Sequence, residues 1–389
     1  MSVPLNIVFL ADHLGYRDGI AHGVTTYCHT VFPRLTGTNL RLKCLFLGPP
    51  YPAAVSLQDA GIEVKFLDRP KHDFTVGHKV ARVLGRWRPR IVHVTQQKST
   101  ALARLLAPFY NYRLVAHLHD FEPVPSALRL AAALTRRPDM MLCVTSKLIP
   151  TAVEQYGIPS DRCKVLPNGL DLSLFRRIDA SARQDVRVAF GIPQHAPVIG
   201  MAVRLFPDKR PENFIVDARG ILKRCPDVHF LIAGDGPERA PCERLASQLG
   251  IAAQTHIVGY YDDVRSLISA CDVVALYSLV EACPYAAIEA LALGKPVIGF
   301  DAGGMSEIVE TGITGFLAET GRPGELVDRA VDLIQNVQLR RAMSENCIRN
   351  VEKFSIDRHV AALYEVYTGL VGGNFDARKK PFLVRIGKY

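Results

Sequence analysis

Short apolar runs alternate with longer amphipathic stretches along this chain, and this alternation limits the possible folds more than any other feature of the sequence. The apolar runs have the length of single strands, and the stretches between them have the spacing of helices with one apolar face. Such an order predicts parallel sheets wrapped by helices. In the first half of the chain, strands are expected at residues 5–10, 42–47, 64–67, 91–94, 114–118 and 141–144.

A polar, charged stretch from about 171 to 197 separates this series from a second one of the same kind. The second series has expected strands at 198–203, 228–233, 256–258, 273–276, 296–300 and 315–318. The sequence therefore predicts an α/β protein with two Rossmann-like, doubly wound domains. We expect a first domain at 1–175, a linker at 176–196, a second domain at 197–355, a helix at 356–371 and a basic tail at 372–389. Ligands of such folds bind outside the carboxyl ends of the strands.

Composition agrees with a two-domain protein, because 389 residues are too many for one ordinary core. The nine cysteines are scattered without a Cys-x-x-Cys pair, which argues against structural disulfides or zinc and favours the cytoplasm. The apolar N-terminus lacks the basic leader of a secretion signal, so we interpret it as the first strand. The net charge of +9 indicates a polyanionic partner. Nucleotide phosphates or an anionic membrane are better candidates than nucleic acid, since no nucleic-acid-binding motif is present.

Two carboxylates stand out in the second domain. Glu281 lies in the loop after an expected strand, and Glu289 lies about one turn into the helix that begins near Pro284. A helix N-terminus can bind a diphosphate, and a carboxylate beside it can accept hydrogen bonds from a ribose diol. By spacing alone, a solvated loop glutamate and a helix-surface glutamate are the better explanation of the pair.

Two cations follow another strand of the same domain. Arg204 and Lys209 lie in the loop before the next helix, where an arginine fork and a mobile lysine suit a diphosphate. A solvated basic loop explains them about as well. The glycine-rich turn at 233–237 permits a tight connection from strand to helix, and we prefer this interpretation to a phosphate cradle.

Taken in order, these motifs resemble the retaining glycosyltransferases of family GT4. The resemblance rests on Arg204 and Lys209, on AGDGPE, VGYYDDV, Glu281-x7-Glu289, KPVIGFDAGGMSEIV and GITGFLAE, and on PNGLDLSLF in the first domain, so it covers essentially the whole chain. It implies the GT-B fold, with two Rossmann-like domains facing across a cleft and the last helix crossing back to the first domain. It also implies transfer of a hexosyl group from a UDP- or GDP-linked sugar to a hydroxyl of a glycan, glycolipid or lipid-linked acceptor, in cell-surface polysaccharide or glycoconjugate synthesis.

The same resemblance assigns roles to single residues. Arg204 and Lys209 would neutralise the donor diphosphate, Glu289 would bind the ribose, and Glu281 would orient the hexose. The remaining donor contacts would come from His119, from the N–H groups of Tyr285 and Ala286 after Pro284, and from Val258, Tyr260 and Tyr261 beside the base. No cofactor is expected. No metal ion is expected either, since the chain lacks the Asp-x-Asp motif of metal-dependent transferases, and Arg204 and Lys209 can supply the charge instead.

Several positions depart from the family pattern. Glycines usually stand where this chain has Val203 and Arg210, Pro-Ser stands where it has Tyr277-Ser278, and Gly-Phe stands where it has Ala282-Cys283. In the first domain, the loop that ends at Gly23 resembles the family's Gly-Gly loop beside the diphosphate and the acceptor. His22 occupies its first glycine position and is a candidate acceptor contact. Gly23 would let the backbone approach an oxyanion of the donor, and it is explained equally well as an ordinary turn residue. The charges of the site are kept, but the shape of the sugar pocket differs.

Other interpretations compete with these assignments. His117 and His119 share one face of a strand, which suits a metal site, but a packed histidine pair explains them better. Basic helices at 79–90 and 127–137 could hold the protein peripherally on the cytoplasmic face of an anionic membrane, or they could pack on the sheet with solvated arginines. The rival functions are a nucleotide-sugar epimerase of the same fold and a non-catalytic nucleotide-sugar-binding subunit.

Overall fold

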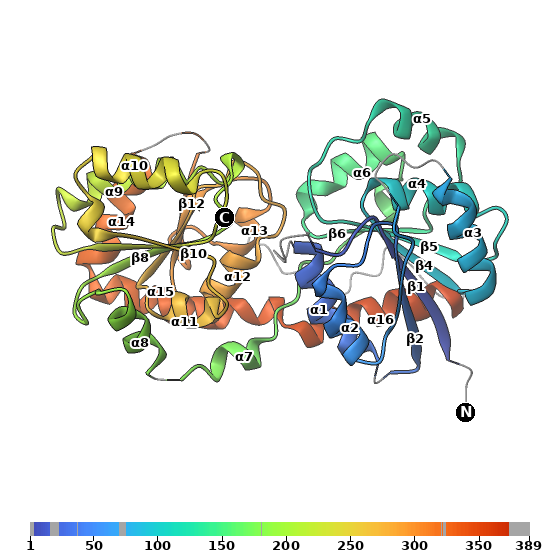
Figure 1. Cartoon of the computed structure of the whole chain (residues 1–389), viewed down its shortest axis with the longest axis horizontal. Helices are drawn as coiled ribbons and strands as arrows, with labels where there is room; N and C mark the ends of the chain where they lie inside the picture. Colours follow the sequence, from blue (N-terminus) through green and yellow to red (C-terminus); the bar gives the residue numbers. More distant parts are fainter. Residues whose placement is uncertain are drawn as a thin grey trace. The chain divides into compact units, whose positions relative to one another are not determined.

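The computed structural model describes residues 4–15, 23–36, 38–69, 75–179, 181–319, 321 and 324–372. It divides the chain into two compact units, and Figure 1 shows both with most of their helices and strands labelled. The first unit combines Met1–Gly169 with Ile356–Tyr389, and the second unit is Leu170–Ser355. Each unit contains one parallel sheet with helices packed on it, which confirms the predicted α/β class with two doubly wound units.

The sheet of the first unit has seven strands in the described residues, in the order β3-β2-β1-β4-β5-β6-β7. The order changes direction between β1 and β4, which pair in parallel, so this is the topological switch point of the sheet. The strands are β1 Leu5–Ala11, β2 Leu40–Phe46, β3 Glu63–Phe66, β4 Ile91–Thr95, β5 Arg113–Leu118, β6 Met140–Cys143 and β7 Cys163–Val165. The helices are α1 Gly23–Leu35, α2 Val55–Asp59, α3 Val76–Trp87, α4 Gln97–Leu106, α5 Ser126–Leu134, α6 Ile149–Tyr156 and α16 Ile356–Gly372.

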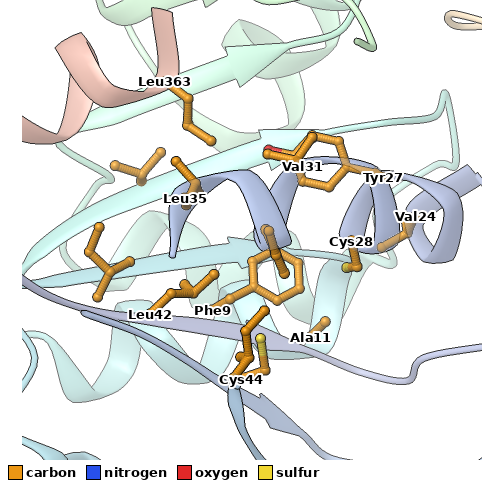
Figure 2. Packing of buried hydrophobic residues seen from close by; sticks show 14 of the residues in the cluster. Phe9, Ala11, Val24, Tyr27, Cys28, Val31, Leu35, Leu42, Cys44 and Leu363 are labelled. Atoms are coloured by element: carbon orange, nitrogen blue, oxygen red, sulfur yellow. The ribbon is translucent and has the colours of Figure 1, made fainter. Parts of the chain in front are cut away.

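Helix α16 completes the core of the first unit although it follows the whole second unit in the sequence. Its apolar residues Leu363, Val366 and Tyr367 are fully buried. Leu363 lies in the same cluster as Val31 of α1 and Phe9 of β1, and all three side chains are drawn in Figure 2. The apolar residues of α16 recur every three or four positions and so form one face of the helix. This face packs against the apolar face of α1 over the sheet.

The sheet of the second unit has six strands in the part of the chain that the structure describes, in the order β10-β9-β8-β11-β12-β13. Here the order changes direction between β8 and β11, which also pair in parallel. The strands are β8 Val198–Ala202, β9 His229–Ala233, β10 Thr255–Gly259, β11 Val273–Leu276, β12 Val297–Phe300 and β13 Gly315–Ala318. The helices are α7 Leu172–Arg176, α8 Ala182–Ala189, α9 Pro211–Leu222, α10 Arg239–Gln248, α11 Val264–Ser269, α12 Tyr285–Ala292, α13 Met305–Ile308, α14 Glu325–Gln335 and α15 Val337–Asn350.

The segment 176–196, which we expected to link the domains, lies inside the second unit and contains α8. The reason is Arg187, whose side chain has no exposed surface. Its guanidinium donates to the carbonyl oxygens of Ala270 and Ala196, at 2.9 Å and 2.7 Å, and pairs with Asp272 at 3.2 Å. A buried arginine with these partners fixes α8 to the end of α11 and the start of β11, so α8 is part of the second unit, which starts at Leu170.

Candidate functional site

Lys209 and Glu281, which come from separate loops, meet at the switch point of the second sheet. Lys209 ends a short 3-10 turn, Pro207–Lys209, after β8, and Glu281 lies in the loop after β11. The Lys209 Nζ lies 2.7 Å from the Glu281 Oε1, and both side chains are largely buried. The two loops are further joined by the Leu279 N–H, which donates to the Asp208 carbonyl at 2.9 Å. The structure therefore forms a shielded ion pair at the edge where doubly wound sheets bind ligands.

Arg204 lies in the same loop as Lys209, with its guanidinium 5.0 Å above the ring of Phe206. The glycine-rich turn after β9 supports this loop. A Cβ atom at Gly234 would lie 1.8 Å from the Val203 carbonyl oxygen, and one at Gly236 would lie 2.3 Å from that of Leu205. These glycines are therefore needed because two backbones touch here, which supports our preference for a tight connection over a phosphate cradle.

Arg210 departs from the family pattern, and its backbone explains why glycine usually stands there. It adopts φ 48° and ψ 47°, the left-handed conformation that glycine accepts more easily than other residues. Its guanidinium pairs with Glu212 at 3.2 Å. Arg210 therefore keeps the backbone shape of the loop while it adds a charge next to Lys209.

Helix α12 brings Pro284, Tyr285, Ala286 and Glu289 to the same edge of the sheet. Pro284 is the N-cap residue rather than the first helical residue, and its ψ of 125° turns the chain into the helix. The first N–H groups of a helix point along its axis and attract anions. Burial raises the pKa of the Glu289 carboxyl to about 7, so this group is close to half ionised at neutral pH.

The three residues expected beside the base lie at the end of β10, the edge strand of this sheet. Val258 and Tyr261 pack against an apolar cluster that includes Leu231 and Leu267, whereas the Tyr260 side chain is 61% exposed. Part of the side-chain surface of Val258 and Tyr261 is therefore taken up by contacts with the core. Tyr260 is the member of the group with a face available to a ligand.

His119 follows β5 in the first unit and belongs to a buried aromatic cluster. Its ring centroid lies 4.1 Å from that of His117 and 4.9 Å from that of Tyr27 on α1. Burial lowers the pKa of His117 well below the ordinary value, so His117 is neutral at physiological pH. The two histidines are packed ring against ring, and among the described residues no group of three metal-ligating side chains gathers.

Sequence reasoning missed the partners of this histidine pair. Tyr27 lies on a helix with an apolar face, and His359 lies on α16, far away in the sequence. A signal was available in α16, where His359, Leu363 and Val366 share the four- and three-residue spacing of one helix face and are all buried.

Gly23 begins α1, and a Cβ there would meet nothing within 4 Å, so packing does not require glycine. His22 lies outside the described residues.

The two basic helices differ in where their apolar residues point. In α3, the apolar side chains Val80, Val83, Leu84 and Trp87 are buried, so this stripe belongs to the core of the first unit. In α5, Leu130 is 65% and Leu134 is 80% exposed, and Phe109 after the neighbouring helix α4 is 78% exposed. Leu130 and Leu134 are four residues apart, so their exposed side chains lie on the same face of α5.

Comparison with known proteins agrees with this architecture. The family model described as Glycosyltransferase Family 4 matches residues 21–174, and the one described as Glycosyl transferases group 1 matches residues 182–350. The chain is 28% identical over 302 residues to the D-inositol 3-phosphate glycosyltransferase of Corynebacterium urealyticum, covering 72% of this chain and 71% of that protein. It is 27% identical over 299 residues to the UDP-Gal:alpha-D-GlcNAc-diphosphoundecaprenol alpha-1,3-galactosyltransferase of Escherichia coli, covering 72% and 76% of the two chains.

Among solved structures, that of Anabaena HepE in complex with UDP-glucose superposes with a TM-score of 0.80 at 23% identity. The match covers 94% of this chain and 100% of that one. This likeness confirms the GT-B fold, and the family models confirm the resemblance seen in the sequence.

Proposed function

We propose a donor, an acceptor class and a stereochemistry for this chain, which belongs to glycosyltransferase family 4 and is a hexosyltransferase. The donor is a hexose linked to UDP or GDP, and the acceptor is a hydroxyl of a glycan, a glycolipid or a lipid-linked sugar. Transfer retains the anomeric configuration and needs no metal ion. The observation that carries the proposal is the shielded pair of Lys209 and Glu281 at the switch point of the second sheet.

The relatives support the choice of donor and acceptor. HepE binds UDP-glucose, and the Escherichia coli relative is named for transfer from UDP-Gal to a sugar on diphosphoundecaprenol. The basic composition of this chain suits a diphosphate donor, and a lipid-linked acceptor would bring the protein to a membrane surface.

In the proposed mechanism, the bond between the anomeric carbon and the donor phosphate oxygen breaks while the acceptor oxygen bonds to that carbon from the same face. The acceptor proton passes to an oxygen of the leaving diphosphate. Arg204 and Lys209 stabilise the charge that develops on this leaving group. Because Lys209 already pairs with Glu281, the diphosphate competes with this carboxylate for the ammonium, and Glu281 becomes available to orient the hexose.

His119 and Glu289 complete the proposed donor contacts. Glu289 in its ionised form accepts hydrogen bonds from the ribose hydroxyls, and Tyr260 lies beside the base. His119 contacts the hexose. The N–H groups of Tyr285 and Ala286 contact the phosphate at the start of α12.

The test of this function uses the purified chain with UDP-glucose, UDP-galactose and GDP-mannose, in EDTA, with and without a hydroxyl acceptor. We expect slow donor hydrolysis alone, and transfer with retained anomeric configuration by NMR of the product. Lys209→Ala should lower kcat about 100-fold or more, while Lys223→Ala, an exposed lysine on the same unit, should not. Unchanged turnover in Lys209→Ala would refute the assignment. A new hexose epimer without acceptor would indicate an epimerase, and binding without hydrolysis would indicate a non-catalytic subunit.

We further propose that α5 and the end of α4 contact an anionic membrane. The exposed residues Leu130, Leu134 and Phe109 would enter the interface, and the exposed Arg129 and Arg137 would meet lipid phosphates. Among the described residues, no helix has the length and hydropathy to cross a bilayer.

The membrane contact is tested by sedimentation with vesicles that contain anionic lipid. Leu130→Ser with Leu134→Ser should release the protein from these vesicles, whereas Val216→Ser, an exposed apolar residue of the second unit, should leave binding unchanged. Equal binding to neutral and anionic vesicles would exclude the electrostatic part of the proposal.

A further inference from the structure

Tyr27 is the centre of a buried group of histidine rings in the first unit. It comes from α1 and has no exposed surface. Its ring meets His119 at 4.9 Å, His117 at 5.3 Å and His359 at 5.4 Å between centroids, with interplanar angles of 65°, 89° and 75°. These edge-to-face contacts are the favoured geometry of aromatic pairs. One phenol ring from α1 thus packs against β5 and α16 at once.

We propose that Tyr27 and His359 are positioning residues that hold the His119 ring in its working orientation. The inference rests on the proposed role of His119 at the donor hexose. It goes beyond that role because it makes the activity of His119 depend on two other side chains. These two side chains come from helices at opposite ends of the sequence.

The state of the His359 ring follows from its hydrogen bonds. Its Nδ1 lies 2.7 Å from the carbonyl oxygen of Pro167, and since a carbonyl only accepts, Nδ1 carries the proton. Burial lowers the pKa of His359 to about 4, so the ring is neutral and Nε2 accepts. Nε2 faces the Tyr27 hydroxyl at 3.5 Å, which is a long contact, so ring packing carries most of the link.

The backbone of His359 is held by a close contact with Gly169. A Cβ atom at Gly169 would lie 2.7 Å from the Cβ of His359 and 2.9 Å from Ile356, so the backbone passes directly against the first turn of α16. A second link from α16 is made by Tyr367, whose hydroxyl lies 2.6 Å from the His93 Nδ1. His93 in turn stacks on His117, with ring centroids 5.4 Å apart. The His117–His119 pair is therefore supported from two points of one helix.

This packing has a direct consequence for His119. It follows Leu118, the last residue of β5, and its ring contacts Tyr27 and His117. Removal of the Tyr27 ring would free one side of His119. A displacement of about 1 Å in a catalytic group lowers turnover by up to about 100-fold.

The experiment is a double-mutant cycle on the full chain. Tyr27→Leu should lower kcat about tenfold or more with little change in the KM for the donor, and His359→Leu should act in the same direction. Tyr27→Phe keeps the ring and should restore most of the turnover. On a His119→Gln background, Tyr27→Leu should lower kcat no further, because it acts through His119. His229→Gln, from a stacked histidine pair in the second unit, is the matched control.

The outcomes separate this inference from the proposed function. If His119→Gln keeps full turnover, the role of His119 is wrong, whatever Tyr27 does. If His119→Gln is impaired and Tyr27→Leu adds an independent loss, Tyr27 has only a structural role and the inference is overturned. NMR of the His119 ring gives a readout without activity: its signals should shift in Tyr27→Leu and His359→Leu but not in His229→Gln. Unmoved signals would also overturn the inference.

Discussion

Acidification should destabilise the first unit through its buried histidines. Burial lowers the pKa of His93 to about 3 and that of His359 to about 4, from an ordinary value of 6.5. Both rings stay neutral in the folded protein and take up a proton on unfolding below pH 6.5. Their contribution to stability is therefore complete above pH 6.5 and is lost as the pH falls towards the folded values. His117, whose pKa is also lowered by burial, acts in the same direction.

The magnitude follows from these pKa values. Each such histidine reduces the free energy of unfolding by about 1.4 kcal/mol per pH unit once the unfolded ring is charged. Between pH 7 and pH 5 this amounts to about 2 kcal/mol for each ring, or about 4 kcal/mol for His93 and His359 together. Typical total stabilities are about 5–15 kcal/mol, so the loss is large.

The chain offers a specific probe for this measurement. Trp87 is the only tryptophan and is buried on α3, so its fluorescence reports the first unit alone. Urea unfolding at pH 7 and pH 5 should show the loss in the wild type. His359→Asn, which keeps a donor for the Pro167 carbonyl but does not titrate, should show a loss smaller by about 2 kcal/mol. The contributions of the other titrating groups to the pH dependence are the same in both proteins, so they cancel in the difference. Equal pH dependence in both would refute the reasoning.

Three further changes test the second unit. Arg187→Met should destabilise it by about 3–5 kcal/mol, because Asp272 and several carbonyl oxygens lose a buried partner; a cost under about 1 kcal/mol in thermal unfolding would contradict this. Arg210→Gly should keep the loop and raise stability by up to about 1 kcal/mol, since it relieves a left-handed backbone; calorimetry would expose a loss instead. UDP-glucose should bind about tenfold more weakly at pH 6 than at pH 8, since Glu289, with a pKa near 7, is protonated at the lower pH and cannot accept both ribose hydrogen bonds; calorimetric titration of Glu289→Gln should show no such dependence.

The parallel sheets could be predicted because buried parallel strands are short apolar runs, a local property of the sequence. The pair of Lys209 and Glu281 could be predicted only as two separate motifs. Strand order decides which loops meet. Lys209 and Glu281 are 72 residues apart in the sequence, and their loops lie together because β8 and β11 pair in the sheet. The predicted linker at 176–196 differs from the structure, in which this segment belongs to the second unit. In the sequence, Arg187 reads as a solvated charge, because its carbonyl partners are known only from the fold.

The contact between Tyr27 and His359 spans 332 residues and could not be predicted from spacing. Both side chains lie on helix faces that otherwise read as ordinary apolar stripes. Tyrosine and histidine can occupy a buried position on such a face as leucine does. The spacing therefore predicts that the position is buried, but not which polar contacts its side chain makes.

The return of α16 to the first unit also sets an order of assembly during synthesis. Domains generally fold as units in the order in which they emerge from the ribosome. Here the core around Phe9 and Val31 lacks Leu363, Val366 and Tyr367 until the entire second unit has been made. The second unit is continuous from Leu170 to Ser355 and can therefore fold first. Until α16 is made, the first unit has an apolar face that no helix covers.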